Sequence, residues 1–492
     1  MTCVKMAERI SLSLVFSILA LLGALFLGVA ISLFSPIYAF IIAGALIVAI
    51  MVVLRLDELI LTLIVAIQIL VEAYLGYAVY QVSLLMGLLL LVVCYFGRSA
   101  KRPWTEPRWL WLWLMFLVWN IVPTLKGGSF SLSNSVGYYL EVVVSSFIGF
   151  WLGNLIARDI APIRRLLQLL SLLAVFFAIH TIIQATTGVF LFESARAKMN
   201  LLAASNFQIG GSVSRASSFF GNPNGAGGFM ATCLFLPLGL FVESKRLWAK
   251  IIYLGESLLI LAALMFTYST GSWIAAIAGI FVFIFLVGRL RYSLLLSLLI
   301  VGVGVLAMVL FPAQINVQLT HARDQGDLSL HLATWQTAAR VTEAYPLFGV
   351  GLGNYAYLAR SQPYRVLAQT KPLAEPDNSY LQWGAIAGIP AMLVFLSLLT
   401  LIFWNGWRNW LILDSRYRCL FAGGICALIA LSVDSLTVDG WTSPGYIVWL
   451  IAGIIVSPLV GRCLNSQPVL SAVETDYAQL GASWMDEARQ CA

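Results

Sequence analysis

Basic and aromatic side chains gather in one long polar stretch of the chain, from Phe311 to Ser379. Most of the sequence before it is apolar, so this stretch is the part best suited to chemistry. Arginine holds anions through paired contacts, which makes anion binding the first chemistry to consider. The residues in question are Arg323, Arg340, Arg360, Arg365, Lys371, Trp335, Tyr345, Tyr355, Tyr357 and Tyr364.

A second polar segment, over about 187–224, ends in a turn formed by Asn222-Pro223-Asn224. A helix is predicted to begin directly after it, and unpaired N–H groups at a helix N-terminus attract anions. Arg215 lies seven residues before Asn222 and is within reach of the same anion. The alternative is a plain helix cap with an arginine that extends to the membrane interface.

Within the first stretch, the sequence predicts an amphipathic helix that lies on the membrane surface and ends before Pro346. Asp327 suits its N-cap, and both His331 and Arg340 belong to it. Its apolar residues recur at helical spacing. They are Leu328, Leu332, Trp335 and Ala339.

Three alternating glycines follow, Gly349, Gly351 and Gly353, which predict a close approach of backbone segments. A lone Gly-x-Gly-x-Gly is a weak phosphate signal, and because no strand precedes it, a Rossmann site is excluded. The stretch closes on Asp377-Asn378 before the next apolar run. Asp377 is either the N-cap of that helix or a general base at the membrane mouth.

The chain as a whole has the composition of a multi-pass membrane protein. Of its 492 residues, 61% are hydrophobic and 10% are charged, whereas soluble domains carry about 25% charged residues. Apolar runs of bilayer length predict an all-α polytopic fold with about 12–14 transmembrane helices. We expect these helices near 10–34, 37–54, 59–78, 80–97, 109–124, 138–157, 164–186, 225–242, 249–267, 272–288, 292–311, 380–404, 417–433 and 445–461.

The distribution of basic residues predicts the orientation. Most of the 29 Lys and Arg residues fall in short loops on the N-terminal side of the membrane, which the positive-inside rule assigns to the cytoplasm. Both termini are therefore expected inside, and the loops at about 187–224 and 312–379 outside. We divide the chain into a transmembrane domain, 1–463, and a cytoplasmic tail, 464–492. The seven cysteines show no CxxC spacing, so we expect no metal.

Ionisable residues inside the predicted helices are further candidates, because charges in a bilayer are costly and often functional. Glu141 lies near the outer end of its helix, and Asp434 and Asp439 flank an outside loop of the last hairpin. We expect Glu141 and Asp434 to face the substrate. His180 and Glu256 are interpreted as packing or interface residues.

Four motifs, in this order, resemble those of the O-antigen ligase and polymerase superfamily. The resemblance covers about residues 200–400. It rests on Arg215 with Asn222-Pro223-Asn224, Thr267-Tyr268-Ser269-Thr270-Gly271-Ser272-Trp273, Trp335 with Pro346-Leu347-Phe348-Gly349-Val350-Gly351-Leu352-Gly353-Asn354, and Asp377-Asn378-Ser379-Tyr380-Leu381-Gln382.

The resemblance implies a glycosyltransferase of the lipid-donor type, with a GT-C-like architecture, that takes a glycan from undecaprenyl pyrophosphate and attaches it to an acceptor hydroxyl. It implies no cofactor, metal or nucleic acid, and a place in the bacterial cytoplasmic membrane. This chain departs from the pattern at three positions. Ser269-Thr270-Gly271 stands where the family usually has Ser-Arg, His331 where it often has Arg, and Asp377 where it has the proposed catalytic His.

We therefore expect an inverting ligase or polymerase in which Arg215 and Arg340 hold the pyrophosphate and Asp377 is the base. The alternatives are a bicarbonate or other small-solute transporter of the same superfamily, or a non-catalytic envelope-assembly protein. The residues expected to bind the glycan donor and its glycan or lipid-linked acceptor are Asn222, Asn224, His331, Trp335, Asn354, Asn378, Glu141 and Asp434.

Overall fold

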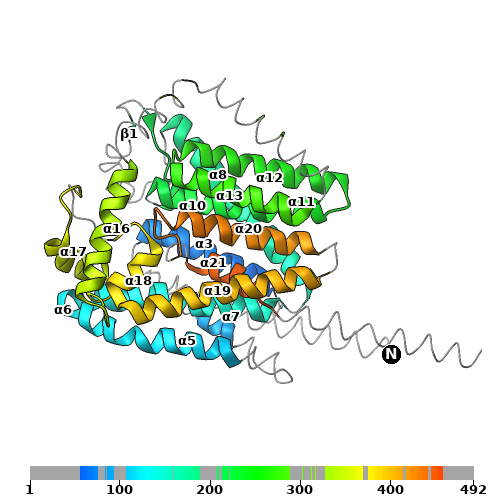
Figure 1. The fold of residues 1–492 in the computed structure, drawn as a ribbon. Coiled ribbons are helices and arrows are strands. Elements are labelled where there is room, and N and C mark those ends of the chain that lie inside the picture. Colours follow the sequence, from blue (N-terminus) through cyan, green and yellow to red (C-terminus); the bar gives the residue numbers. More distant parts are fainter. Residues whose placement is uncertain are drawn as a thin grey trace, which may run out of the picture.

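The computed structural model describes residues 56–75, 84, 86–92, 107–157, 159–188, 208–209, 213–220, 222–288, 298, 302, 312, 316, 327–369, 375–413, 417–441 and 445–457. Long helices dominate it (Figure 1). They are α3 (Asp57–Leu75), α5 (Pro107–Trp119), α6 (Ile121–Tyr138), the π-helix η1 (Tyr139–Val144), α7 (Ser145–Ile156), α8 (Ile160–Thr187), the 3-10 helix η3 (Ser218–Phe220), α10 (Pro223–Cys233), α11 (Phe235–Glu243), α12 (Leu247–Phe266), α13 (Thr270–Val287), α16 (Asp327–Ala344), α17 (Asn354–Ser361), the 3-10 helix η4 (Gln362–Tyr364), α18 (Ser379–Ala387), α19 (Ile389–Ile412), α20 (Arg418–Asp434) and α21 (Gly445–Ile455).

The all-α fold class is confirmed. In the described residues, strand structure is limited to one antiparallel pair of two-residue strands, β1 (Gln208–Ile209) and β2 (Val213–Ser214). Within the part of the chain that the structure describes, six candidate membrane spans are long and apolar enough to cross a bilayer. The predicted helices at 10–34 and 37–54 and the tail at 464–492 lie outside the described residues, and only residues 298 and 302 of the predicted helix at 292–311 are described. The predicted total of about 12–14 helices therefore stays a prediction.

An exposed apolar stripe on α13 shows how these helices meet lipid. Ile274, Ile277, Phe281 and Phe285 recur every three or four residues, and Phe281 is 78% exposed. A row of this kind in water would be an aggregation site, whereas in a bilayer it is the expected outer surface. The protein is therefore a multi-pass membrane protein.

Small residues bring neighbouring helices into backbone contact inside the bundle. Gly149 and Gly153 of α7 are spaced as GxxxG and face α21. A Cβ at Gly153 would lie 2.2 Å from the Leu450 carbonyl oxygen, and one at Gly453 would lie 2.1 Å from that of Phe150. Since lipid tails supply no hydrophobic drive between helices, this close packing stabilises the pair.

Three helix boundaries differ from the prediction. The runs 109–124 and 138–157 are joined through helical turns, with a kink where Ser131 takes the extended values φ −162° and ψ 106°. The run 380–404 is divided into α18 and α19 at Gly388, which has φ +90°. The run 225–242 is divided into α10 and α11 at Leu234. Hydropathy reports apolar length but not local backbone angles, so it does not predict these interruptions.

The polar segments gather at one end of the bundle (Figure 1). There α16 runs across the ends of the long helices, with α17, α18, α6 and β1 around it. The helix predicted from Asp327 is confirmed as α16. Its protein-facing side is formed by Ala333, Thr337 and Val341, while Leu332 of the predicted apolar face is 44% exposed. Trp335 and Ala339 of the predicted face are partly buried, so that face lies at the edge of the contact with the bundle.

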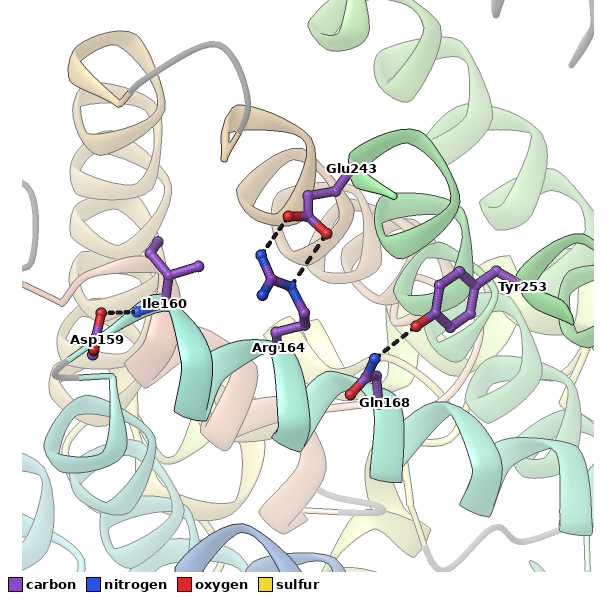
Figure 2. Close-up of polar contacts among 6 residues, drawn as sticks. All are labelled: Asp159, Ile160, Arg164, Gln168, Glu243 and Tyr253. Atoms are coloured by element: carbon purple, nitrogen blue, oxygen red, sulfur yellow. Dashed lines mark hydrogen bonds and ion pairs between the residues drawn. The ribbon is translucent and has the colours of Figure 1, made fainter. Parts of the chain in front are cut away.

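At the opposite end of the bundle, the polar side chains at the start of α8 form hydrogen bonds and an ion pair (Figure 2). Arg164 of α8 forms a two-pronged ion pair with the buried Glu243 at the end of α11. One turn further along α8, the Gln168 amide donates to the Tyr253 hydroxyl at 2.6 Å. Asp159 accepts from the Ile160 N–H and caps the same helix. These contacts fix the start of α8 against α11 and α12.

Candidate active site

The cap of α18 is Asn378 and not Asp377, which decides between the two interpretations of the aspartate. The Asn378 Oδ1 atom accepts from the N–H groups of Tyr380 and Leu381, each at 3.0 Å. Its Nδ2 atom donates to the Leu436 carbonyl at 3.1 Å. Asn378 is therefore a structural residue. Among the described residues no hydrogen bond engages the Asp377 carboxylate, which is partly exposed at the mouth of the helix.

Asp377 is held in an uncommon backbone conformation. Its φ is +50°, in the left-handed region that aspartate tolerates better than most residues. The cap position of α18 is already filled by Asn378. A strained backbone of this kind persists only where surrounding contacts impose it. Such residues are concentrated at functional sites.

Three carboxyl groups meet beside the mouth of α18, and we call Glu375, Asp377 and Asp439 the acidic cluster. The carboxyl groups of Glu375 and Asp439 are hydrogen-bonded to each other, and Asn354 at the start of α17 hydrogen-bonds Glu375. Removal from water and the neighbouring charges hold the pKa of Glu375 well above its usual range. Burial and the charge of Asp439 raise the pKa of Asp377 to about 7.

The turn that carries Asp439 is fastened to the first turn of α18. Ser379 donates its N–H to the Ser435 carbonyl at 3.0 Å and its hydroxyl to the Val438 carbonyl at 3.4 Å. The Trp441 N–H donates to the Ser379 hydroxyl at 3.3 Å. Because these contacts bracket Asp439, they hold it against the loop that contains Glu375 and Asp377.

A π-helix brings a second group of polar residues to the same place. Glu141 lies in η1, which begins directly after Tyr138. The Tyr138 hydroxyl accepts from the Gln382 amide at 2.7 Å. Glu141, Glu375 and Asp439 all act electrostatically on Tyr138. A π-helix widens one turn and is frequent at functional sites. That Glu141 faces the substrate stays a prediction.

Asp434 is buried behind the acidic cluster and not open to substrate. It is 1% exposed, and its Oδ1 atom accepts from the Ser272 hydroxyl at 2.7 Å. Its Oδ2 atom has no hydrogen-bond partner within the described residues and faces Gly228 of α10, where an added Cβ would lie 2.2 Å away. Asp434 therefore locks α10 and α13 to α20, a different position from the predicted substrate contact.

Arg215 lies at the junction of α10 and α12. Its Nε atom donates to the Thr267 carbonyl at 3.0 Å, and its Nη2 atom donates to the Asn224 side chain. Asn222 caps α10 by accepting from the Asn224 N–H at 2.9 Å. The guanidinium is thus fixed at the N-terminus of α10, where the predicted anion site requires it.

The comparison with protein families matches the segment that contains the acidic loop. Residues 256–396 match the family model described as O-antigen ligase. This segment is O-antigen ligase-like. The resemblance expected over about 200–400 is confirmed over this shorter range, which includes Asp377 but not Arg215. The comparison with curated proteins gives no match. The family match supports a role in joining or polymerising glycans at a membrane.

Within the ligase-like segment, the Gly349–Gly353 run is a structural strap. Val350 and Gly351 donate to the carbonyls of Ala385 and Ile386 at the end of α18, at 2.8 and 3.0 Å. Lys126 and Arg360 donate to carbonyls of the run itself. Since its N–H groups bond protein carbonyls and its carbonyls hold the cations, the run does not cradle phosphate. The predicted close approach is confirmed, because a Cβ at Gly351 would lie 2.5 Å from the Gly127 nitrogen.

The three predicted residues on α16 are placed apart from the acidic cluster. Arg340 is exposed, while His331 and Trp335 are each partly buried on the same helix. Arg215 donates instead to Thr267 and Asn224, and the charge that acts on Asp377 is that of Asp439. The structure therefore brings together Asp377, Asn354 and Asn378, and places Arg215, Asn222 and Asn224 together at α10.

Sequence reasoning missed Glu375 as a site residue and did not give Asp439 a role beside Asp377. A usable signal was present, because Glu375-Pro376-Asp377 puts two acids at the close of a long basic stretch. Tyr138 and Gln382 were not predicted as site residues, although Gln382 closes the fourth motif of the resemblance. No group of three His, Cys, Asp or Glu residues in the described ranges is placed to hold a metal ion.

Proposed function

We propose that this protein transfers a glycan from a lipid-linked pyrophosphate to an acceptor hydroxyl, with Asp377 as the general base. The single observation that supports this proposal most is the position of Asp377 together with its raised pKa. It lies at the mouth of a helix that another residue caps, and its pKa of about 7 suits proton abstraction at neutral pH. The ligase-like match over residues 256–396 supplies the reaction class.

The reaction that fits these residues is a single displacement. The acceptor oxygen attacks the anomeric carbon of the donor sugar, and its proton passes to the Asp377 carboxylate. The bond between that carbon and the pyrophosphate oxygen breaks, and the leaving pyrophosphate takes the electron pair. Attack opposite to the leaving group inverts the anomeric centre, and undecaprenyl pyrophosphate is the donor that we propose.

Arg215 and the N-terminus of α10 suit the leaving group. A guanidinium at the positive end of a helix dipole stabilises negative charge as it develops on a phosphate oxygen. Both Asn222 and Asn224 contribute by holding this geometry, one as the cap and the other against Arg215. We propose Arg340, His331 and Trp335 as outer residues of α16 that meet the longer glycan.

The helix interruptions favour an enzyme over a transporter. In transporters, broken helices expose carbonyls and helix ends to the transported solute. Here the backbone groups at the break near Gly388 are already hydrogen-bonded. The carbonyls of Ala385 and Ile386 accept from the Gly349–Gly353 run, and the Ile389 N–H donates to the Pro346 carbonyl. The backbone groups that a solute would need are occupied by protein.

A reconstituted assay tests the proposal. The purified protein is supplied with an undecaprenyl-pyrophosphate glycan and candidate glycan or lipid-linked acceptors, and release of undecaprenyl pyrophosphate is measured. We expect release that depends on the acceptor, with inverted linkage in the product. Entry of labelled bicarbonate into proteoliposomes, without glycan transfer, would establish the transporter instead.

A further inference from the structure

The hydrogen bond between the Glu375 and Asp439 carboxyl groups implies that the two share a proton. Two ionised carboxylates in contact repel each other and offer no donor, so one of them must carry the hydrogen. The pair then bears a single negative charge. Because burial and the neighbouring charges hold the pKa of Glu375 well above its usual range, Glu375 carries the shared proton and the negative charge lies on Asp439. Asn354 hydrogen-bonds Glu375 from the start of α17.

We propose that Asp439 is a positioning residue that sets the proton affinity of Asp377, and that Glu375 holds Asp439 for this task. The inference rests on the proposed role of Asp377 as base. Asp439 lies in the turn between α20 and α21, whereas Asp377 lies in the loop before α18, so their approach depends on the tertiary fold. The Ser379 contacts with Ser435, Val438 and Trp441 fix that approach.

The groups around Asp377 give the direction of the effect. Glu375 shares its loop, Asp439 faces it from the turn after α20, and Tyr357 faces it from α17. Tyr138 and Glu141 of α6 and η1 lie beyond the carboxyl pair. Among the described residues no arginine or lysine acts on Asp377. A negative charge at Asp439 therefore favours the protonated form of Asp377 and makes the carboxylate a stronger base.

A matched pair of variants isolates the charge at position 439. Glu375→Gln keeps a hydrogen-bond donor for Asp439 and leaves its charge in place. The double variant Glu375→Gln with Asp439→Asn removes that charge and changes the shape of the site very little. Glu343→Gln, an exposed residue on α16, provides a control for loss of a carboxylate elsewhere.

Infrared titration of the protein without substrate measures the result. The C=O stretch of protonated Asp377 is identified by its loss in Asp377→Asn, and its midpoint is followed with pH. We expect equal midpoints in wild type, Glu343→Gln and Glu375→Gln, and a midpoint lower by about one to two pH units in the double variant. Equal midpoints in Glu375→Gln and the double variant would overturn the proposal.

Turnover of an undecaprenyl-pyrophosphate glycan separates this inference from the proposed function. If transfer occurs, the acid limb of its pH profile moves down with the infrared midpoint in the double variant. When Asp439→Glu replaces Asp439→Asn in the double variant, the carboxylate is restored and the acid limb of the pH profile returns toward that of wild type. If no variant transfers glycan but the infrared midpoint still moves, the proposed function fails while the effect of Asp439 on Asp377 stands.

Discussion

The two ends of the helix bundle treat their polar residues in opposite ways. At one end every charge shown in Figure 2 has a partner, with Arg164 against Glu243 as the clearest case. At the other end the acidic cluster places carboxyl groups against one another, and none of the ion pairs found in the described residues involves it. The first arrangement stabilises the fold, whereas the second costs stability.

This difference indicates where function lies. Like charges in contact raise the free energy of the folded protein and shift pKa values, and such arrangements concentrate at functional sites. The strained φ of Asp377 is a second cost at the same end. None of the six residues drawn in Figure 2 has a positive φ, so we expect substitutions there to affect folding and not chemistry.

The largest effect is expected from Asp377→Asn. The amide keeps the size of the side chain but accepts no proton, so turnover should fall by about a hundredfold to ten-thousandfold. Release of undecaprenyl pyrophosphate from a reconstituted donor measures it, with Glu343→Gln as the matched control. A variant with at least half of the wild-type rate would remove Asp377 from the chemistry.

Arg215→Ala is expected to have the next largest effect. It removes the guanidinium from the N-terminus of α10 and the contacts with Thr267 and Asn224. Loss of one group that stabilises developing charge costs about a hundredfold to a thousandfold in rate. Arg215→Lys retains the charge but cannot make both contacts, and should recover a small part. Equal turnover in wild type and Arg215→Ala would show that the donor site is elsewhere.

Arg164→Met tests the other side of the comparison. It leaves the buried Glu243 carboxylate without its partner, which should lower stability by about 3 kcal/mol. Thermal unfolding in detergent measures this loss, and the double variant with Glu243→Gln should recover part of it. The rate per folded molecule should stay at the wild-type level. A large fall in that rate without a loss of stability would contradict the division between the two ends.

Arg340→Ala should have the smallest effect. The residue is exposed on α16 and apart from the acidic cluster, so its loss should change the rate by about twofold or less, in line with about 0.5 kcal/mol for an isolated surface residue. The same turnover assay measures it. A fall as large as that of Arg215→Ala would restore Arg340 to the donor site that the sequence predicted.

Much of the fold could be predicted because apolar length and helix spacing are local properties. The helix beginning at Asp327 and the cap-and-turn sequence at Asn222 both follow from their own residues. The kink at Ser131, the π-helix at Tyr139–Val144 and the break at Gly388 do not, because packing against distant segments imposes them. Gly388, for example, faces the Leu347 carbonyl oxygen across the strap.

The site was less predictable than the fold. Asp377 and Glu141 could be selected as acids near the membrane mouth, but the partner of Glu375 is Asp439, more than sixty positions away along the chain. Local sequence also could not show that Lys126 and Arg360 bond backbone carbonyls and are thereby committed to structure. Both facts depend on which segments the fold brings together.

The pH dependence of glycan transfer by the wild-type protein tests the central claim most directly. Asp377 must be ionised to accept a proton, and its pKa is raised from 3.8 to about 7, so kcat/KM should fall as pH decreases through about 7. In Asp377→Asn the activity should be lost, and the fall of kcat/KM at low pH should be lost with it. A rate that stays constant down to the ordinary aspartate value of 3.8 would contradict the account.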